Sequence, residues 1–153
     1  MKRNLLLLLL AASVIMLASS CRKFVVTSGT PLSGTWYLES VSRYDGYRWQ
    51  TISTGYESGT FYFKSNGNIS YHDALGDLYG SWNLYPVTSA YYDGYGHYTE
   101  GYHQVLALSL YEAGNQHPAA DWLFEDCDFN GGNSFAAAYT SGGFTYEFHF
   151  VRE

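Results

Sequence analysis

Cysteine, proline and basic residues are scarce in this chain of 153 residues. It contains two cysteines and three prolines, and its eight lysine and arginine residues face 14 acidic residues, for a formal net charge of −6. Two cysteines exclude a fold that is held together by a disulfide network. The excess of acidic residues argues against nucleic-acid binding, which depends on neutralising phosphate charge with lysine and arginine.

Long apolar runs are also missing, apart from the run between Leu5 and Leu17. This run follows the basic head Lys2-Arg3 and precedes a small-residue segment that ends at Cys21. Its length suits the apolar region of a secretory signal and falls short of a spanning helix. Residues 1–20 are therefore predicted to be a signal peptide.

The segment before Cys21 resembles a bacterial lipobox, although Ala18 stands where leucine is usual. The resemblance implies cleavage before Cys21 and acylation of this cysteine, with residues 21–33 as a tether; a plain secreted protein is the alternative. Two or more acyl chains make a stable membrane anchor. Because no acidic pair follows Cys21, lipoprotein sorting signals imply the outer membrane and a periplasm-facing body, and surface display stays open.

Beyond residue 33 the chain alternates aromatic segments with turn signals such as Asp45-Gly46, Asn66-Gly67 and Asp93-Gly94. Tyrosine alone occurs 16 times and no helical period of useful length is present, which is typical of antiparallel strands. The expected strands are Thr35–Arg43, Tyr47–Ser53, Gly59–Lys64, Asn68–His72, Leu78–Tyr85, His103–Tyr111, Asp121–Cys127, Ser134–Tyr139 and Gly143–Val151.

Nine short strands in one small domain, residues 34–153, must hide their sheet edges. We therefore expect an all-β fold, an antiparallel up-and-down meander closed into a small barrel, with a β-sandwich as the alternative. The last strand alternates Phe144, Tyr146, Phe148 and Phe150 with polar residues, so its aromatic face should lie in the core. Cys127, which has no partner if Cys21 is acylated, is predicted to be a buried thiol.

The first and last strands carry a family resemblance. Gly34-Thr35-Trp36 opens the first strand and Arg152 ends the last one. This arrangement resembles the lipocalin and lipocalin-like family, in which the tryptophan closes the base of a barrel and an arginine covers its indole. The resemblance implies a barrel closure made by Gly34, Trp36 and Arg152, and a small apolar or amphipathic ligand inside the barrel.

The sequence offers little support for catalysis or for a cofactor. It has no Gly-x-Ser-x-Gly elbow, its five histidines lack ligand spacing, and Cys127 lies among acidic residues. Asp126, Asp128 and Asn130 match the start of a calcium-binding loop, but Ala137 stands where such a loop needs glutamate. An acidic hairpin turn is the preferred interpretation, with calcium as the alternative.

One tyrosine-rich segment is the main candidate for ligand binding. Tyrosine combines a large face, few rotatable bonds and a hydroxyl, which suits stacking against glycans, flat ligands or proteins. The segment should form a long hairpin or flap beside the barrel, or simply pack against the barrel wall. Its candidate ligand-binding residues are Trp82, Tyr85, Tyr91, Tyr92, Tyr95, Tyr98 and Tyr102.

Together these patterns predict a non-catalytic, lipid-anchored envelope protein that binds a small apolar or amphipathic ligand or a glycan. The alternative is a structural or protein-interaction lipoprotein whose barrel core is solid. An empty apolar cavity of roughly 300 Å³ or more would favour the first prediction. A packed interior with a flat exposed aromatic patch would favour the second.

Overall fold

The computed structural model of the protein describes residues 32–153, in which all regular structure is β-strand. No helix within this range is long and apolar enough to span a membrane. The predicted signal peptide, Cys21 and most of the tether lie outside the described residues. The strands are β1 (Gly34–Tyr44), β2 (Trp49–Ile52), β3 (Thr60–Phe63), β4 (Asn68–His72), β5 (Asp77–Tyr92), β6 (Tyr98–Glu112), β7 (Ala120–Phe124), β8 (Asp126–Asn130), β9 (Ser134–Ser141) and β10 (Phe144–Arg152).

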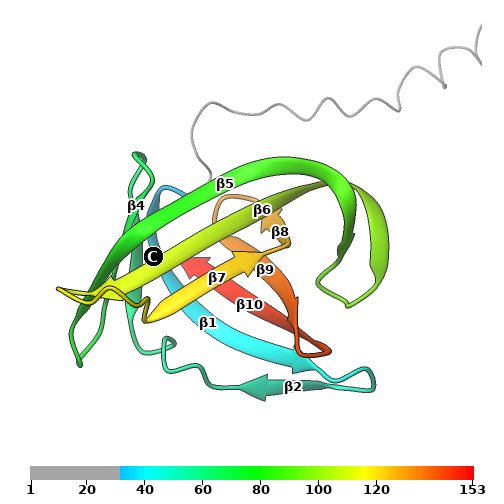
Figure 1. Cartoon of the computed structure of the whole chain (residues 1–153), viewed down its shortest axis with the longest axis horizontal. Helices are drawn as coiled ribbons and strands as arrows, with labels where there is room; N and C mark the ends of the chain where they lie inside the picture. Colours follow the sequence, from blue (N-terminus) through cyan, green and yellow to red (C-terminus); the bar gives the residue numbers. More distant parts are fainter. Residues whose placement is uncertain (1–31) are drawn as a thin grey trace, which may run out of the picture.

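All ten strands belong to one antiparallel sheet, which curls around a common interior (Figure 1). The hydrogen-bonded order is β7-β6-β5-β4-β3-β1-β10-β9-β8, with β2 paired to β1. The first half of β1 pairs with β3 and the second half with β2, while β10 runs along its other edge. The predicted all-β antiparallel meander is therefore confirmed, and a division into two sheets is not observed.

Hydrogen bonds do not close this sheet into the expected barrel. Its two ends, β7 and β8, are consecutive in the chain and are separated only by Glu125, whose N–H donates to the Ala138 carbonyl at 2.7 Å. The segment therefore leaves β6 at Phe124 and joins β9 from Asp126 onward. This change of partner divides the single expected strand Asp121–Cys127, so the sheet has ten strands instead of nine.

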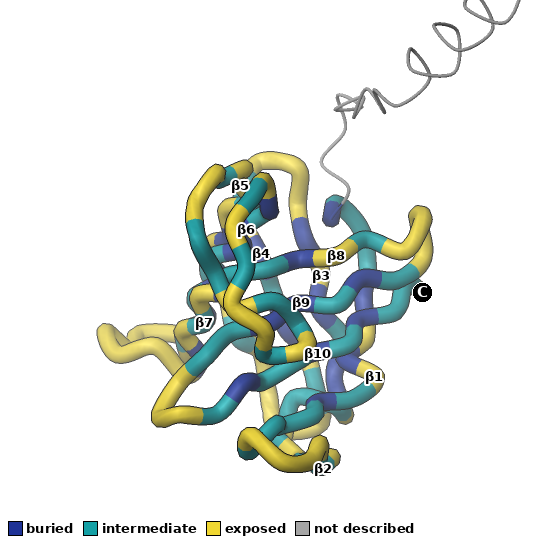
Figure 2. The backbone as a smooth tube through the Cα atoms, turned by 90° about the vertical axis from the view of Figure 1, so that its right-hand side faces the viewer, coloured by how far each residue is buried: buried dark blue, intermediate teal, exposed yellow. Residues whose placement is uncertain are grey.

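The core consists of the side chains on the inner face of the curled sheet. Figure 2 shows buried positions recurring along neighbouring strands. Phe148 and Phe150 on β10 are buried as predicted, and the Phe150 ring stacks on Phe135 at 4.6 Å. Phe144 and Tyr146, on the same face but nearer the end of the sheet, are only partly buried. The interior is filled by aromatic and aliphatic side chains, the largest being Trp36, Phe61, Phe63, Phe124, Phe135, Phe148 and Phe150.

Candidate functional site

Trp36 and Arg152, the two residues of the predicted closure, contact each other. They face each other in the β1–β10 ladder, and the Arg152 guanidinium carbon lies 4.4 Å from the centre of the Trp36 ring. Trp36 is 1% exposed, and its indole N–H donates to the Leu32 carbonyl at 2.7 Å. A Cβ on Gly34 would lie 2.7 Å from Arg152 Nη1. A larger residue at position 34 would therefore collide with the guanidinium in its position over the indole.

The predicted tyrosine-rich segment forms the far part of the β5–β6 hairpin, which we call the arch (residues 85–102). Figures 1 and 2 show the arch curling back over the outer faces of β9 and β10. Its tip contacts these strands: a Cβ on Gly94 would lie 3.2 Å from the Glu147 carboxylate and 4.0 Å from Ala138 Cβ. The arch therefore covers the outside of the sheet, which agrees with the alternative that the hairpin packs against the wall rather than with a flap that stands apart from it.

The curvature of the arch follows from the residues along β6. From Leu106 to Leu110 every second side chain is buried in the core, whereas His103 and Val105, on the opposite face, are buried beyond that point. The buried face of β6 thus changes at Val105–Leu106. This is also where β7 ends its pairing with β6 at Leu106, which leaves the far part of β6 free to bend over β8.

Two adjoining hollows lie between the arch and the outer face of the sheet. The larger, about 370 Å³, is lined by Tyr91, Tyr102, His103, Gln104, Asp126, Cys127, Asp128 and Phe129. The smaller, about 180 Å³, is lined by Asp93, Gly94, Tyr95, Asp126, Asp128, Asn130, Ala136, Ala138, Glu147 and His149. Because Asp126 and Asp128 line both, we treat the two hollows as one feature and call it the cleft.

The sheet register explains why the cleft is hollow. Ala138 of β9 stands between Asp126 of β8 and Glu147 of β10, while Ala136 stands between Asp128 and His149. Neighbouring strands are about 4.8 Å apart, so the acidic residues of β8 and β10 flank a strip about 10 Å wide at the backbone. The cleft has a floor of alanine methyl groups, acidic side walls and the arch as its roof.

Carboxylates dominate the electrostatics of the cleft. Burial raises the pKa of Asp126, as do the nearby charges of Asp128 and Asp93, while His103 and a hydrogen bond from the Gly94 N–H act in the opposite direction. The Glu147 carboxylate lies 3.3 Å from His149 Nε2. At the tip, Asp93 lies 3.6 Å from His97 Nδ1. The walls of the cleft therefore carry closely spaced negative charge.

His103 is the most deeply buried polar side chain of the cleft, at 6% exposure. Its ring stacks on Tyr91 with centres 3.9 Å apart, and its Nδ1 lies 3.2 Å from the Gly101 carbonyl oxygen. A carbonyl oxygen only accepts hydrogen bonds, so Nδ1 carries the proton. The stack with Tyr91 and the bond to Gly101 hold the imidazole at one side of the larger hollow.

The predicted ligand-binding residues are divided between the cleft, the surface and the core. Tyr91 and Tyr102 line the larger hollow and Tyr95 lines the smaller one. Tyr92 and Tyr98 form an exposed edge-to-face pair at 5.5 Å, and Tyr85 is 36% exposed outside both hollows. Trp82 lies in the core, where its indole N–H bonds the Lys64 and Asn68 carbonyls.

The residues of the proposed calcium loop belong to strand β8, not to a loop. Asp126, Asp128 and Asn130 alternate along β8, and the turn that follows covers residues 131–133. The predicted acidic hairpin turn is therefore also wrong in position, because the acidic residues are paired with β9. Within residues 32–153 no group of three or more His, Cys, Asp or Glu side chains is arranged to hold a metal ion.

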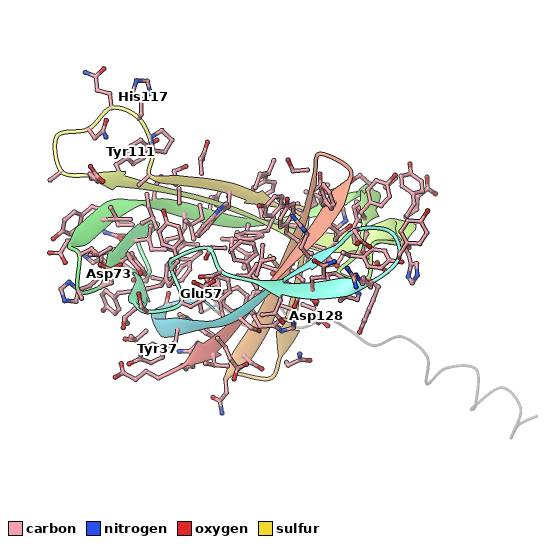
Figure 3. All side chains as sticks on the ribbon, turned by 90° about the horizontal axis from the view of Figure 1, so that it is seen from below. Tyr37, Glu57, Asp73, Tyr111, His117 and Asp128 are labelled. Carbon is pink, nitrogen blue, oxygen red and sulfur yellow. The ribbon has the colours of Figure 1, made fainter. Side chains whose placement is uncertain are left out.

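Two other candidate reactive side chains in the described part of the chain are Cys127 and His117. The Cys127 thiol is unpaired and buried, and burial raises its pKa strongly, with the Asp126 charge acting in the same direction. Such a thiol is a poor nucleophile. His117 lies in the loop between β6 and β7, well separated from Asp128 (Figure 3).

Sequence reasoning missed the contributions of Asp93, His103, Glu147 and His149. Alternation along β10 does place Glu147 and His149 on the outer face, opposite the aromatic core. No sequence signal shows that the arch covers this face, because the contact joins segments about 50 residues apart. Comparison with protein-family models, curated proteins and solved structures finds no match to the chain.

Proposed function

We propose that this protein is a non-catalytic, lipid-anchored binding module of the bacterial cell envelope that takes a small ligand in the cleft under the arch. The observation that carries the proposal is the larger hollow of about 370 Å³, which combines aromatic rings with carboxylates. Its volume lies in the range of small-molecule sites. The lipobox-like segment that ends at Cys21 supports the anchor and the envelope location.

A site outside the sheet agrees better with the packing than a ligand inside it. The interior holds rings in mutual contact, such as Trp36 on Phe135 at 4.8 Å and Phe124 on Phe148 at 5.1 Å. Aromatic side chains that fill the space between strands leave no volume for an apolar ligand. The contact of Trp36 with Arg152 supports a relation to the lipocalin-like family as part of this proposal. The proposal does not include the internal ligand that the resemblance implies.

Native mass spectrometry of the full-length protein, purified in a mild detergent from the cells that make it, tests this proposal. We expect an additional small mass that disappears on unfolding. Tyr102→Ala should remove this mass, because Tyr102 lines the cleft. Tyr62→Ala is the matched control, since Tyr62 is similarly exposed (46% against 53%) but lies on β3. A mass that survives in Tyr102→Ala would place the ligand elsewhere.

The second candidate function is a protein-interaction lipoprotein. It is favoured by Tyr92 and Tyr98 of the arch, which contact each other, line neither hollow and are 43% and 67% exposed. Exposed tyrosines of this kind are enriched in protein interfaces. A clean mass without any ligand in the experiment above would favour this candidate.

A further inference from the structure

The cleft brings several hydrogen-bond acceptors together, and within residues 32–153 no lysine or arginine lines it. Asp126 and Asp128 line both hollows, and Asp93 and Glu147 line the smaller one. Only four lysine or arginine residues follow Lys23 in the sequence, and none of them lines either hollow: Arg43, Arg48, Lys64 and Arg152. The four carboxylates therefore have only histidines beside them as charge partners, and a cationic ligand would complement this field.

His103 adds an acceptor from a deeply buried position. Because its Nδ1–H donates to Gly101, the Nε2 atom of the neutral ring is an acceptor. His103 lines the larger hollow together with Asp126 and Asp128. An imidazole nitrogen beside two carboxylates suits a ligand that brings N–H donors.

Apolar surfaces alternate with these acceptors along the cleft. Tyr91 and Tyr102 line the larger hollow, and Ala136 and Ala138 line the smaller one. Aromatic faces attract ammonium groups, and methyl groups pack against methylene groups. The cleft thus presents acceptors at intervals, separated by surface that suits a hydrocarbon chain.

We infer that the ligand of the cleft is a linear polyamine, a chain of methylene groups that joins two or more ammonium groups. One ammonium group would lie between Asp126, Asp128 and the aromatic rings of the larger hollow. A second would lie toward Glu147 and Asp93 under the tip of the arch. The inference rests on the proposed function, since it assigns the ligand class of the same cleft.

A directly coordinated metal ion explains these features less well. The described residues contain no group of three His, Cys, Asp or Glu side chains that could hold a metal. The hollows, about 370 and 180 Å³, also exceed the space that one coordinated ion needs. An extended organic cation uses both hollows and all four carboxylates.

Isothermal titration calorimetry of the full-length protein in a non-ionic detergent, with spermidine as the probe, tests the inference. Spermidine should bind with one-to-one stoichiometry, and Asp128→Asn should weaken binding about tenfold or more through loss of a charge-assisted contact. Tyr102→Ala should also weaken it. The matched control Glu112→Gln removes one charge at the far end of β6, outside the cleft, and should leave the dissociation constant unchanged.

Two other probes, a neutral oligosaccharide and calcium, distinguish a wrong ligand class from a cleft that binds nothing. If a neutral oligosaccharide binds and is lost in Tyr102→Ala while spermidine does not bind, the cleft is a binding site and the polyamine inference is wrong. Calcium that binds with the same sensitivity to Asp128→Asn, in place of spermidine, overturns the inference in favour of a metal. Spermidine binding that is equally weakened by Glu112→Gln is non-specific attraction to an acidic protein and also overturns it.

Discussion

The indole of Trp36 contacts both the Arg152 guanidinium, whose carbon lies 4.4 Å from the ring centre, and the nearly perpendicular Phe135 ring, with ring centres 4.8 Å apart. A guanidinium over an indole contributes about 0.5–2 kcal/mol, depending on how far it is desolvated. The Leu32 carbonyl accepts the indole N–H at 2.7 Å, so the one polar atom of the side chain is satisfied despite its burial. Trp36 thus links the start of the described chain to its last strand.

Replacement of Trp36 by alanine should lower the free energy of unfolding by about 3–5 kcal/mol, the usual effect of removing a large buried aromatic side chain. Chemical denaturation measures this change. Tyr47→Ala is the control, because Tyr47 is 94% exposed and its loss should change stability by less than about 0.5 kcal/mol. Equal stability of Trp36→Ala and the parent would contradict the role of Trp36 as a core residue that links the start of the described chain to β10.

Asp126 illustrates the opposite case, a side chain whose charge opposes folding. Its pKa is raised in the folded protein by burial and by neighbouring carboxylates, so the ionised form is less favourable folded than unfolded. Asp126→Asn should therefore raise the melting temperature near neutral pH. The gain should shrink as the pH falls through the raised pKa and vanish below the ordinary value of 3.8, where both states are protonated.

Melting curves of both proteins between neutral and acidic pH check this prediction. If the cleft binds a cation, the same substitution weakens binding while it stabilises the fold. A lower melting temperature of Asp126→Asn near neutral pH would mean that Asp126 serves the fold rather than a ligand.

At the scale of elements, the change of strand partner at Glu125 and the formation of the arch are connected. The segment that follows β7 turns to β9, and β5 and β6 continue as a two-stranded ribbon without a third partner. An isolated two-stranded ribbon is marginal in water. The arch is therefore stabilised by the contact of its tip with the sheet, where Gly96 lies close to Thr145 and Tyr44.

Gly96→Ala should weaken the contact of the arch tip with β10 and β1 without unfolding the core. Gly96 has φ +77°, and a Cβ there would lie 3.2 Å from Thr145 Oγ1 and 3.3 Å from the Tyr44 ring. Gly114→Ala is the matched control, since Gly114 has φ +80° but no neighbour within 4 Å of an added Cβ. Both variants carry similar backbone strain, and only the first adds tight contacts with β10 and β1.

Hydrogen–deuterium exchange measures the difference. Amides of residues 86–101 should exchange faster in Gly96→Ala than in Gly114→Ala, with similar protection of the core strands in both. Equal protection of the arch in the two variants would show that its position does not depend on the tip.

At the scale of the whole molecule, the chain is an acidic body that we expect to be tethered through Cys21. Replacement of Cys21 by serine should move the protein from the membrane fraction to the soluble fraction of the envelope, since acyl chains on this cysteine are the predicted anchor. Fractionation and labelling with a fatty-acid analogue measure the change. Membrane association that survives in Cys21→Ser would contradict the lipoprotein assignment.

The sequence by itself determined the strand content, the antiparallel meander and part of the core. Period-two alternation marked Phe148 and Phe150 as inward residues, and the turn residues separated the strands, because both signals are local. The contact of Trp36 with Arg152 was expected from the family resemblance, and the structure places the two residues opposite each other on the first and last strands.

Only the tertiary structure decided where the sheet ends and what the tyrosine-rich hairpin covers. Residues Asp121 to Cys127 look like one strand, and nothing local shows that the backbone changes partner at Glu125. The cleft needs Asp93 from the arch, Asp126 from β8 and Glu147 from β10 on one face of the sheet. Their proximity depends on the bend of a ribbon over strands distant in sequence, and long-range packing, not local pattern, sets that bend.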